Sequence, residues 1–126
     1  MPGQTVNDLL NEARATIDRL EPAAAQRELE RGALLIDTRC AESRHDDGTV
    51  PGSVHVPLSV LYWRLDPDGF PDHALTDRRR RVIVMCAHGY SSSLAAATLR
   101  RLGFRRAADV IGGFEAWRSA GLPITR

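Results

Sequence analysis

The fold is decided by one stretch, Val82-Ile83-Val84-Met85-Cys86-Ala87-His88-Gly89-Tyr90-Ser91-Ser92. Its first four residues form an apolar run of the kind that is buried on both faces of a parallel sheet. The polar residues after Cys86 lead into a helix that we predict over 92–102, with Gly103 placed to end it. A buried strand that turns into a helix within about six residues predicts a fold in which strands and helices alternate.

Strand-like and helix-like segments also alternate on both sides of this stretch. We predict strands at 16–20, 33–37, 53–57, 82–85 and 107–111. We predict helices at 6–15, 23–31, 59–64, 92–102 and 114–120, and a surface loop at 66–77. This order predicts an α/β fold with a central, mainly parallel five-stranded sheet, helices on both faces and right-handed crossovers. Residues 1–15 would form an N-terminal helical extension, and residues 16–126 would form a single domain.

The composition restricts the chemistry that the chain can perform. The 126 residues are 43% hydrophobic and 26% charged, and the net charge is +1, so we expect neither a nucleic-acid partner nor a membrane. All 17 basic residues are arginine, which excludes lysine Schiff-base and P-loop lysine chemistry. Cys40 and Cys86 are too few for a disulfide framework or a four-cysteine zinc site. We therefore expect a cytoplasmic protein with reduced thiols and with no metal or other cofactor.

Cys86 is the candidate nucleophile, because a short strand-to-helix turn curls its backbone N–H groups inward beneath the sulfur. Gly89 gives this turn conformational freedom, and the following helix adds the positive end of its dipole. Such surroundings lower a thiol pKa from about 8.5 to roughly 3.5–7.5, which predicts an exposed, ionised sulfur. The alternative is a small buried cysteine at a strand end. The remaining loop residues would form an anion cradle, with serine hydroxyls capping the helix or donating to the anion: Ala87, His88, Gly89, Tyr90, Ser91 and Ser92.

Several other residues follow from the predicted sheet. Asp37 and Arg39 should emerge at the same edge as Cys86 and hydrogen-bond to its loop or to one another, although an ordinary surface ion pair remains the alternative. Whether Cys40 acts as a resolving thiol depends on a distance that the sequence does not give. We interpret His88 as a rim residue that tunes donor or acceptor binding rather than as a base. The arginine run 78–81 lies at the opposite end of the sheet, as a solvated cap or a docking patch for a partner.

Four motifs, in order and at the right spacing, resemble the rhodanese (sulfurtransferase) domain family. They are Leu35-Ile36-Asp37-Thr38-Arg39, Val50-Pro51-Gly52-Ser53, the loop from Cys86 to Ser92, and Ile111-Gly112-Gly113-Phe114-Glu115-Ala116-Trp117. The resemblance covers about residues 16–124 and is to the single-domain form related to thiosulfate sulfurtransferase. Residues 60–67 resemble a bacterial subgroup of these proteins.

The resemblance implies that Cys86 carries a sulfane sulfur as a persulfide. The sulfur would come from a donor such as thiosulfate and pass to a thiophilic acceptor, cyanide or a thiol. The loop amides of residues 87–92 would bind the donor and hold the persulfide, with Asp37 and Arg39 in support. A CX5R phosphatase needs an arginine where this chain has Ser92, so a phosphatase is disfavoured. Two alternatives remain: a persulfide relay with a protein donor or acceptor, and a non-catalytic regulatory domain.

Overall fold

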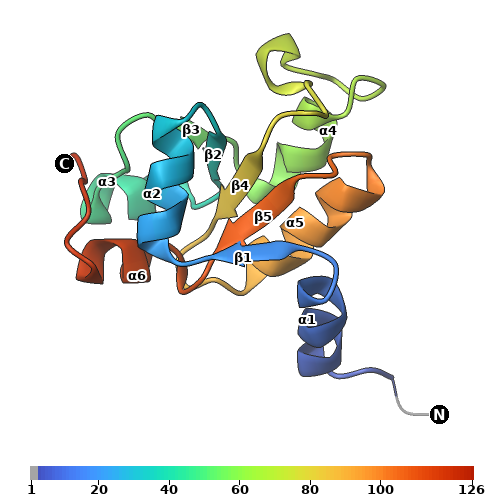
Figure 1. Cartoon of the computed structure of the whole chain (residues 1–126), viewed down its shortest axis with the longest axis horizontal. Helices are drawn as coiled ribbons and strands as arrows, with labels where there is room; N and C mark the ends of the chain where they lie inside the picture. The colour runs from blue at the N-terminus through green and yellow to red at the C-terminus, as the bar shows by residue number, and fades with distance from the viewer. Residues whose placement is uncertain (1–2) are drawn as a thin grey trace.

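A computed structural model describes residues 3–126, which form a central five-stranded sheet flanked by helices (Figure 1). The strand order is β1-β5-β4-β2-β3, and every neighbouring pair is parallel. The strands are β1 (Asp18–Leu20), β2 (Leu34–Asp37), β3 (Val54–His55), β4 (Val82–Met85) and β5 (Ala107–Val110). The helices are α1 (Val6–Arg14), α2 (Pro22–Glu30), α3 (Ala41–Asp47), α4 (Leu61–Leu65), α5 (Ser91–Arg101) and α6 (Gly113–Ser119), with 3₁₀ turns η1 (Leu58–Val60) and η2 (His73–Leu75).

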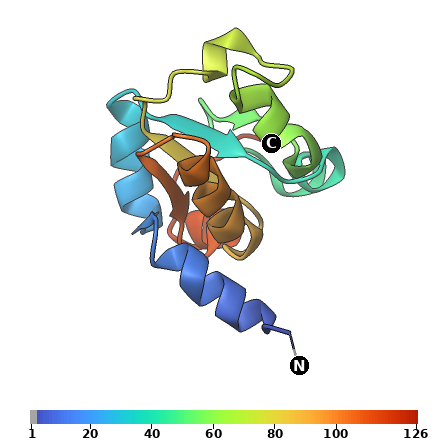
Figure 2. The same cartoon turned by 90° about the vertical axis from the view of Figure 1, so that its right-hand side faces the viewer.

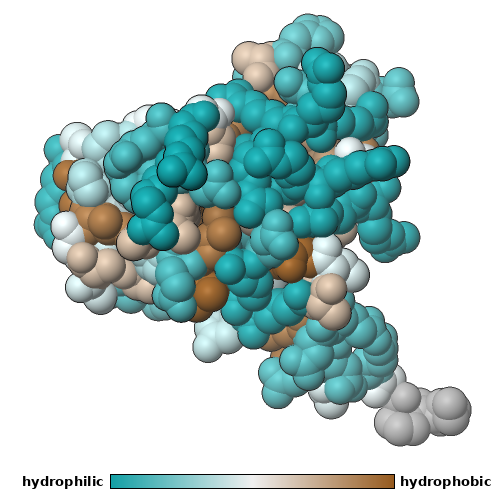
Figure 3. Space-filling view, in the orientation of Figure 1, coloured by the Kyte–Doolittle hydropathy of each residue, from teal (hydrophilic) through white to brown (hydrophobic). Residues whose placement is uncertain are grey.

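Both faces of the sheet are covered by helices, which confirms the predicted α/β fold class. Successive side chains of a strand point to opposite faces. Val82 and Val84 of β4 accordingly pack in a core with α4 and α5, whereas Ile83 and Met85 pack in a second core with α2 and α6. Figure 2 shows these layers from the side. The surface in Figure 3 is largely hydrophilic, and its hydrophobic areas are small and separate.

The strand order places the central strand β4 between β2 and β5. In the register, Asp37 at the end of β2 lies beside Met85, and Asp109 of β5 lies beside Val84. The carboxyl ends of parallel strands meet at one edge of the sheet, which is where α/β proteins bind their ligands. Cys86, the next residue after Met85, therefore emerges between the ends of β2 and β5.

Helix α1 begins with a capping box in which Thr5 and Asp8 exchange hydrogen bonds between side chain and backbone. It packs against α5 and buries Leu10 and Ala13. Figure 2 shows α1 on the outside of the molecule, leading toward the N-terminus. Helix α1 contacts α5 directly. The division of the chain into an N-terminal extension and a domain stays a prediction.

The structure differs from the predicted elements in three places. Helix α3 was not predicted, because none of its residues is buried and the sequence shows no helical hydrophobic period there. The helix predicted at 59–64 is split into η1 and α4, and neither has a side-chain cap. The predicted loop 66–77 contains the turn η2. Within residues 3–126, no helix has the length and hydrophobicity needed to cross a membrane.

The prediction of a solvated cap for the arginine run 78–81 is right for part of the run, because Arg78 and Arg79 are exposed whereas Arg80 and Arg81 are partly buried. The Arg81 side chain is 11% exposed and lies within ion-pair distance of Asp18 and Glu28. Arg78 and Arg80 donate to the backbone carbonyls of residues 102 and 32, respectively. These two carbonyls lie at the C-terminal ends of α5 and α2, where backbone acceptors without an intrahelical partner attract guanidinium groups. The Arg79 side chain is 94% exposed and the Arg78 side chain is 43% exposed, so these two residues fit the prediction of a solvated cap.

Candidate active site

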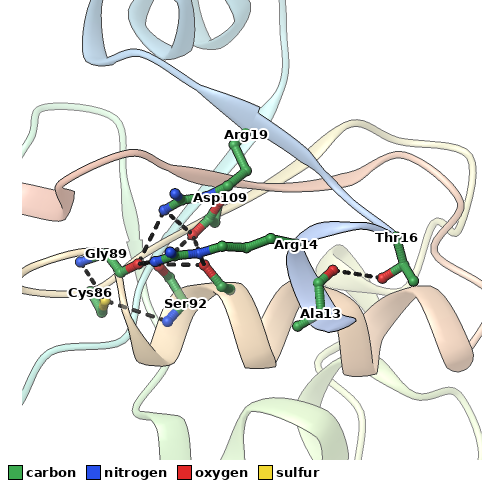
Figure 4. Close-up of polar contacts among 9 residues, drawn as sticks. Ala13, Arg14, Thr16, Arg19, Cys86, Gly89, Ser92 and Asp109 are labelled. Carbon is green, nitrogen blue, oxygen red and sulfur yellow. Dashed lines mark hydrogen bonds and ion pairs between the residues drawn. The ribbon is translucent and has the colours of Figure 1, made fainter. Parts of the chain in front are cut away.

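The sulfur of Cys86 lies inside the loop that follows β4. The Gly89 amide donates to Sγ at 3.1 Å, and the Ser92 amide at the start of α5 donates to it at 3.4 Å (Figure 4). The prediction of an exposed sulfur is wrong, since Cys86 is only 7% exposed. The loop that supplies the amides curls over the sulfur. The backbone that stabilises the thiolate therefore also shields the sulfur from solvent.

These surroundings favour the thiolate form of Cys86. Burial raises the pKa of the thiol, but hydrogen bonds from the hydroxyls of Ser92 and Ser91 and from the amides of Ser92 and Gly89 bring the pKa below its ordinary value. The single hydroxyl proton of Ser92 is engaged by Asp109 Oδ2 at 2.8 Å. The amides of Gly89 and Ser92 are therefore the groups that donate directly to Sγ.

The first two carbonyl groups of the loop are held by the start of α6. The Phe114 amide donates to the Cys86 carbonyl at 2.8 Å, and the Glu115 amide donates to the Ala87 carbonyl at 3.1 Å. This close approach requires glycine at position 113, where φ is +62° and a Cβ would overlap the Cys86 carbonyl oxygen. The glycine pair of the fourth motif thus brings a helix N-terminus against the back of the loop.

The Gly89 carbonyl is held by two arginines from the N-terminal part of the chain. Arg14 Nη2, at the end of α1, donates to it at 2.9 Å, and Arg19 Nη2, on β1, donates at 3.1 Å (Figure 4). Gly89 itself has a φ of +84°, and a Cβ at this position would lie 2.7 Å from the Gly112 nitrogen. The loop is thus fixed from a second side.

The pinned carbonyls determine where three further amides point. In a trans peptide the N–H of the next residue points away from the carbonyl oxygen, and the chain has no cis peptide in its described part. The amides of Ala87, His88 and Tyr90 therefore point away from α6 and from the arginines. Among residues 3–126 they find no protein acceptor. They are free to donate to an anionic ligand beside the sulfur.

A buried carboxylate, Asp109, connects the loop to β5. Its side chain is fully buried and accepts hydrogen bonds from the hydroxyls of Ser92 and Ser93, each at 2.8 Å. Arg19 pairs with it through Nε at 2.9 Å and Nη2 at 3.2 Å. The expectation that loop serines cap α5 is not met, because the α5 N-cap residue Tyr90 makes no side-chain cap and the two hydroxyls face Asp109.

Three of these residues were missed in the sequence analysis: Arg14, Arg19 and Asp109. One signal was present, because Asp109 is the only acidic residue in the otherwise apolar segment 107–111, which predicts a strand. A buried carboxylate needs a cationic or hydrogen-bonding partner, so it marks a connected site. No comparable signal existed for the two arginines, which meet the loop only through the tertiary fold.

Asp37 and Arg39 bond to one another rather than to the loop. Arg39 Nη2 and Nε lie 2.8 and 3.1 Å from the two Asp37 oxygens, and Arg44 Nε lies 3.1 Å from Oδ2. The alternative of a surface ion pair is wrong, since Asp37 is 0% and Arg39 5% exposed. The Arg39 guanidinium also stacks over the ring of Phe114, 3.7 Å from its centroid. The backbone amide of Phe114 donates to the Cys86 carbonyl.

The remaining candidate residues lie at the surface. His88 is exposed, and Tyr90 is 62% exposed with the Arg14 guanidinium 6.0 Å from its ring centroid. Cys40 is exposed, and hydrogen bonds from Ser43 lower its pKa. Both cysteines are free. The part of the chain that the structure describes contains no cluster of three or more metal-ligating side chains.

Comparison with known proteins agrees with this geometry. The family model of the rhodanese-like domain matches residues 21–120. The thiosulfate sulfurtransferase GlpE of Pseudomonas savastanoi is 38% identical over 102 residues, which cover 80% of this chain and 87% of that protein. The GlpE of Actinobacillus succinogenes is 39% identical over 92 residues, 73% of this chain and 75% of that one.

Two solved structures are similar along almost the whole chain. A Rhodopseudomonas palustris protein, described as of unknown function and as a candidate tyrosine phosphatase, matches 99% of both chains with a TM-score of 0.90 and 30% identity. The polysulfide-sulfur transferase of Wolinella succinogenes matches 94% of this chain and 85% of its own, with a TM-score of 0.78 and 26% identity. The chain belongs to the rhodanese-like domain family.

Proposed function

We propose that the chain is a rhodanese-type sulfurtransferase that moves a sulfane sulfur from a donor such as thiosulfate to a thiophilic acceptor through a persulfide on Cys86. The observation that carries the proposal is the loop of amides around Cys86, in which Gly89 and Ser92 donate to Sγ and three more amides of the same loop have no protein acceptor among residues 3–126. The names of the GlpE relatives, thiosulfate sulfurtransferase, agree with this function.

In the first step the Cys86 thiolate attacks the outer sulfur of thiosulfate. A new S–S bond forms to Cys86, the S–S bond of the donor breaks, and sulfite leaves with the electron pair. The free amides of Ala87, His88 and Tyr90 would hold the anionic donor, and later the negative charge on the terminal sulfur of the persulfide. Because backbone groups perform this task, the loop needs no cationic side chain of its own.

In the second step the acceptor attacks the terminal sulfur of the persulfide. Cyanide would become thiocyanate, and a thiolate would become a persulfide, while the Cys86 thiolate leaves and is regenerated. No external electrons are needed in either step. The exposed side chains of His88 and Tyr90 at the rim of the loop would contact donors and acceptors as they enter. Asp37 and Arg39 would support the loop through Phe114.

A phosphatase function is less well supported, despite the description of the Rhodopseudomonas protein. The position six residues after Cys86 is Ser92, whose hydroxyl donates to Asp109. The two arginines that contact the loop, Arg14 and Arg19, use their guanidinium groups to hold the Gly89 carbonyl. The site therefore lacks the arginine fork that clamps a phosphate over the cysteine.

We further propose that the protein works in the cytoplasm, where its two free thiols stay reduced. A protein could replace the small donor or acceptor, since the rim of the loop is exposed. Steady-state turnover with thiosulfate and cyanide separates the two cases. Turnover without any partner supports the small-molecule reaction, and negligible turnover together with persulfide formation only from a partner protein supports a relay.

The decisive experiment is intact-mass spectrometry after incubation with thiosulfate. We expect the wild-type chain to gain about 32 Da, the mass of one sulfur atom, because its thiolate attacks the donor. Cys86→Ser should gain nothing, and the matched control Cys40→Ser should behave like the wild type. A sulfur adduct that persists in Cys86→Ser would refute the assignment of Cys86, and no adduct from any sulfur donor would support a non-catalytic domain.

A further inference from the structure

Two residues outside the matched rhodanese segment 21–120 touch the cysteine loop. Arg14 ends α1 and Arg19 lies on β1, and both donate to the Gly89 carbonyl. We propose that Arg14 and Arg19 are positioning residues that set the reactivity of Cys86 by holding the Gly89 carbonyl. The effect of the two arginines on turnover rests on the proposed function, whereas their effect on the Cys86 thiol does not depend on it.

The Gly89 carbonyl is the group through which the two arginines act. The N–H of Gly89 donates to the sulfur, and the peptide that follows Gly89 presents the free amide of Tyr90 on its far side. Two cationic donors on the Gly89 carbonyl oxygen polarise the peptide between Gly89 and Tyr90 and strengthen the Tyr90 N–H as a donor. They also fix the orientation of Gly89, which adopts a positive φ and, without a Cβ, has access to more backbone conformations than other residues.

The two guanidinium groups are themselves held in place. Arg19 pairs with Asp109 through Nε and Nη2, which leaves Nη2 aimed at the loop as well. Arg14 Nε donates to the Ser93 hydroxyl at 3.0 Å. The Thr16 hydroxyl donates to the Ala13 carbonyl at 2.8 Å where the chain turns from α1 into β1 (Figure 4). This turn delivers both arginines to the same carbonyl.

The charges at this contact favour the thiolate. The two arginines carry two positive charges, and Asp109 carries one negative charge, so the group of three is net positive beside the loop. A positive charge near a thiol stabilises its ionised form, and so does a well-aligned amide. Removal of Arg14 weakens both effects, because one cation is lost and the Gly89 peptide is held by a single donor. The Cys86 pKa should then rise.

The test measures alkylation of Cys86 by iodoacetamide against pH, in the full chain with Cys40→Ser so that one thiol reports. We compare Arg14→Ala, Arg14→Lys and Arg19→Ala with the control Arg79→Ala, which removes an arginine with a 94% exposed side chain. At pH 6 we expect Arg14→Ala and Arg19→Ala to react about three- to tenfold more slowly, which corresponds to a pKa rise of about half to one unit. Arg14→Lys keeps the charge and should recover part of the rate, and Arg79→Ala should not differ from the parent.

Unchanged pH profiles in Arg14→Ala would overturn the inference, even if its melting temperature falls, because a purely structural role lowers stability without moving the thiol pKa. Arg14 carries this test since it pairs with no carboxylate in the described chain, so its loss leaves no buried charge behind. Alkylation needs no sulfur donor. A wild-type chain that fails to take up sulfur from thiosulfate therefore counts against the proposed function and leaves this measurement decisive.

Discussion

The Asp109 carboxylate accepts a hydrogen bond from the Ser92 hydroxyl at 2.8 Å, and this bond connects the first turn of α5 to the neighbouring strand β5. The amide of the same serine donates to the Cys86 sulfur. One residue thus joins the sulfur to a buried carboxylate, and Arg19 balances the charge of that carboxylate. The cysteine loop is thus held by this network on β5 and by the backbone amides at the start of α6.

Asp109→Asn should lower the stability of the fold. The change leaves the Arg19 guanidinium without its counter-charge and weakens the acceptor for two serine hydroxyls. We expect a loss of about 2–3 kcal/mol, below the ~3–5 kcal/mol of a fully buried pair, because the Arg19 side chain is 21% exposed. Urea unfolding measures this difference.

The matched control for that variant is Asp77→Asn, which removes a carboxylate from a surface pair with the 94% exposed Arg79. It should leave the urea midpoint unchanged, since exposed ion pairs contribute little. Equal midpoints for the Asp109 variant and the wild type would show that the buried pair does not stabilise the fold.

The lowered pKa of Cys86 predicts how stability depends on pH. The unfolded chain holds its thiol proton up to the ordinary pKa of about 8.5, whereas the folded chain releases it earlier. Stability rises with pH wherever the unfolded state binds more protons. In a Cys40→Ser background the folded chain should therefore gain stability relative to a further Cys86→Ser variant as pH rises between the two pKa values, by up to ~1.4 kcal/mol per pH unit.

The gain should be complete above the unfolded pKa and lost as pH falls through the folded one. Urea unfolding of both chains at several pH values measures it. Parallel stability curves for the two chains would mean that Cys86 has the same pKa in the folded and unfolded states, which contradicts the amide cradle.

The sequence allowed the site to be placed on the fold, because local patterns carry that information. The apolar run 82–85 predicted a strand buried on both faces, and parallel strands bring Asp37 and Cys86 to one edge. The contacts of Arg14 and Arg19 could not be foreseen. They lie 75 and 70 residues from Gly89 and meet it only because β1 pairs beside β5 at the far side of the sheet.

The burial of Cys86 was mispredicted for a related reason. A local pattern shows that a turn curls around the sulfur, but its exposure depends on how closely Gly89, Gly112 and Gly113 allow the loop and α6 to approach. Helix α3 was not predicted because none of its residues is fully buried, so the sequence has no hydrophobic period there.

Gly113→Ala should damage the cysteine loop more than its backbone strain alone would. The new Cβ overlaps the Cys86 carbonyl oxygen, so α6 must withdraw and the Phe114 amide loses its bond to that oxygen. The matched control is Gly121→Ala, where φ is +73° but no atom lies within 4 Å of the added Cβ. Both variants carry the strain of a left-handed alanine, about 1–2 kcal/mol, and only the first moves the loop.

We expect Gly113→Ala to lose at least tenfold in the rate of persulfide formation from thiosulfate, since a misplaced reacting group costs about that much or more. Gly121→Ala should keep the rate while its melting temperature falls. Equal rates in the two variants would show that the contact between α6 and the Cys86 carbonyl is irrelevant to the reactivity of the sulfur.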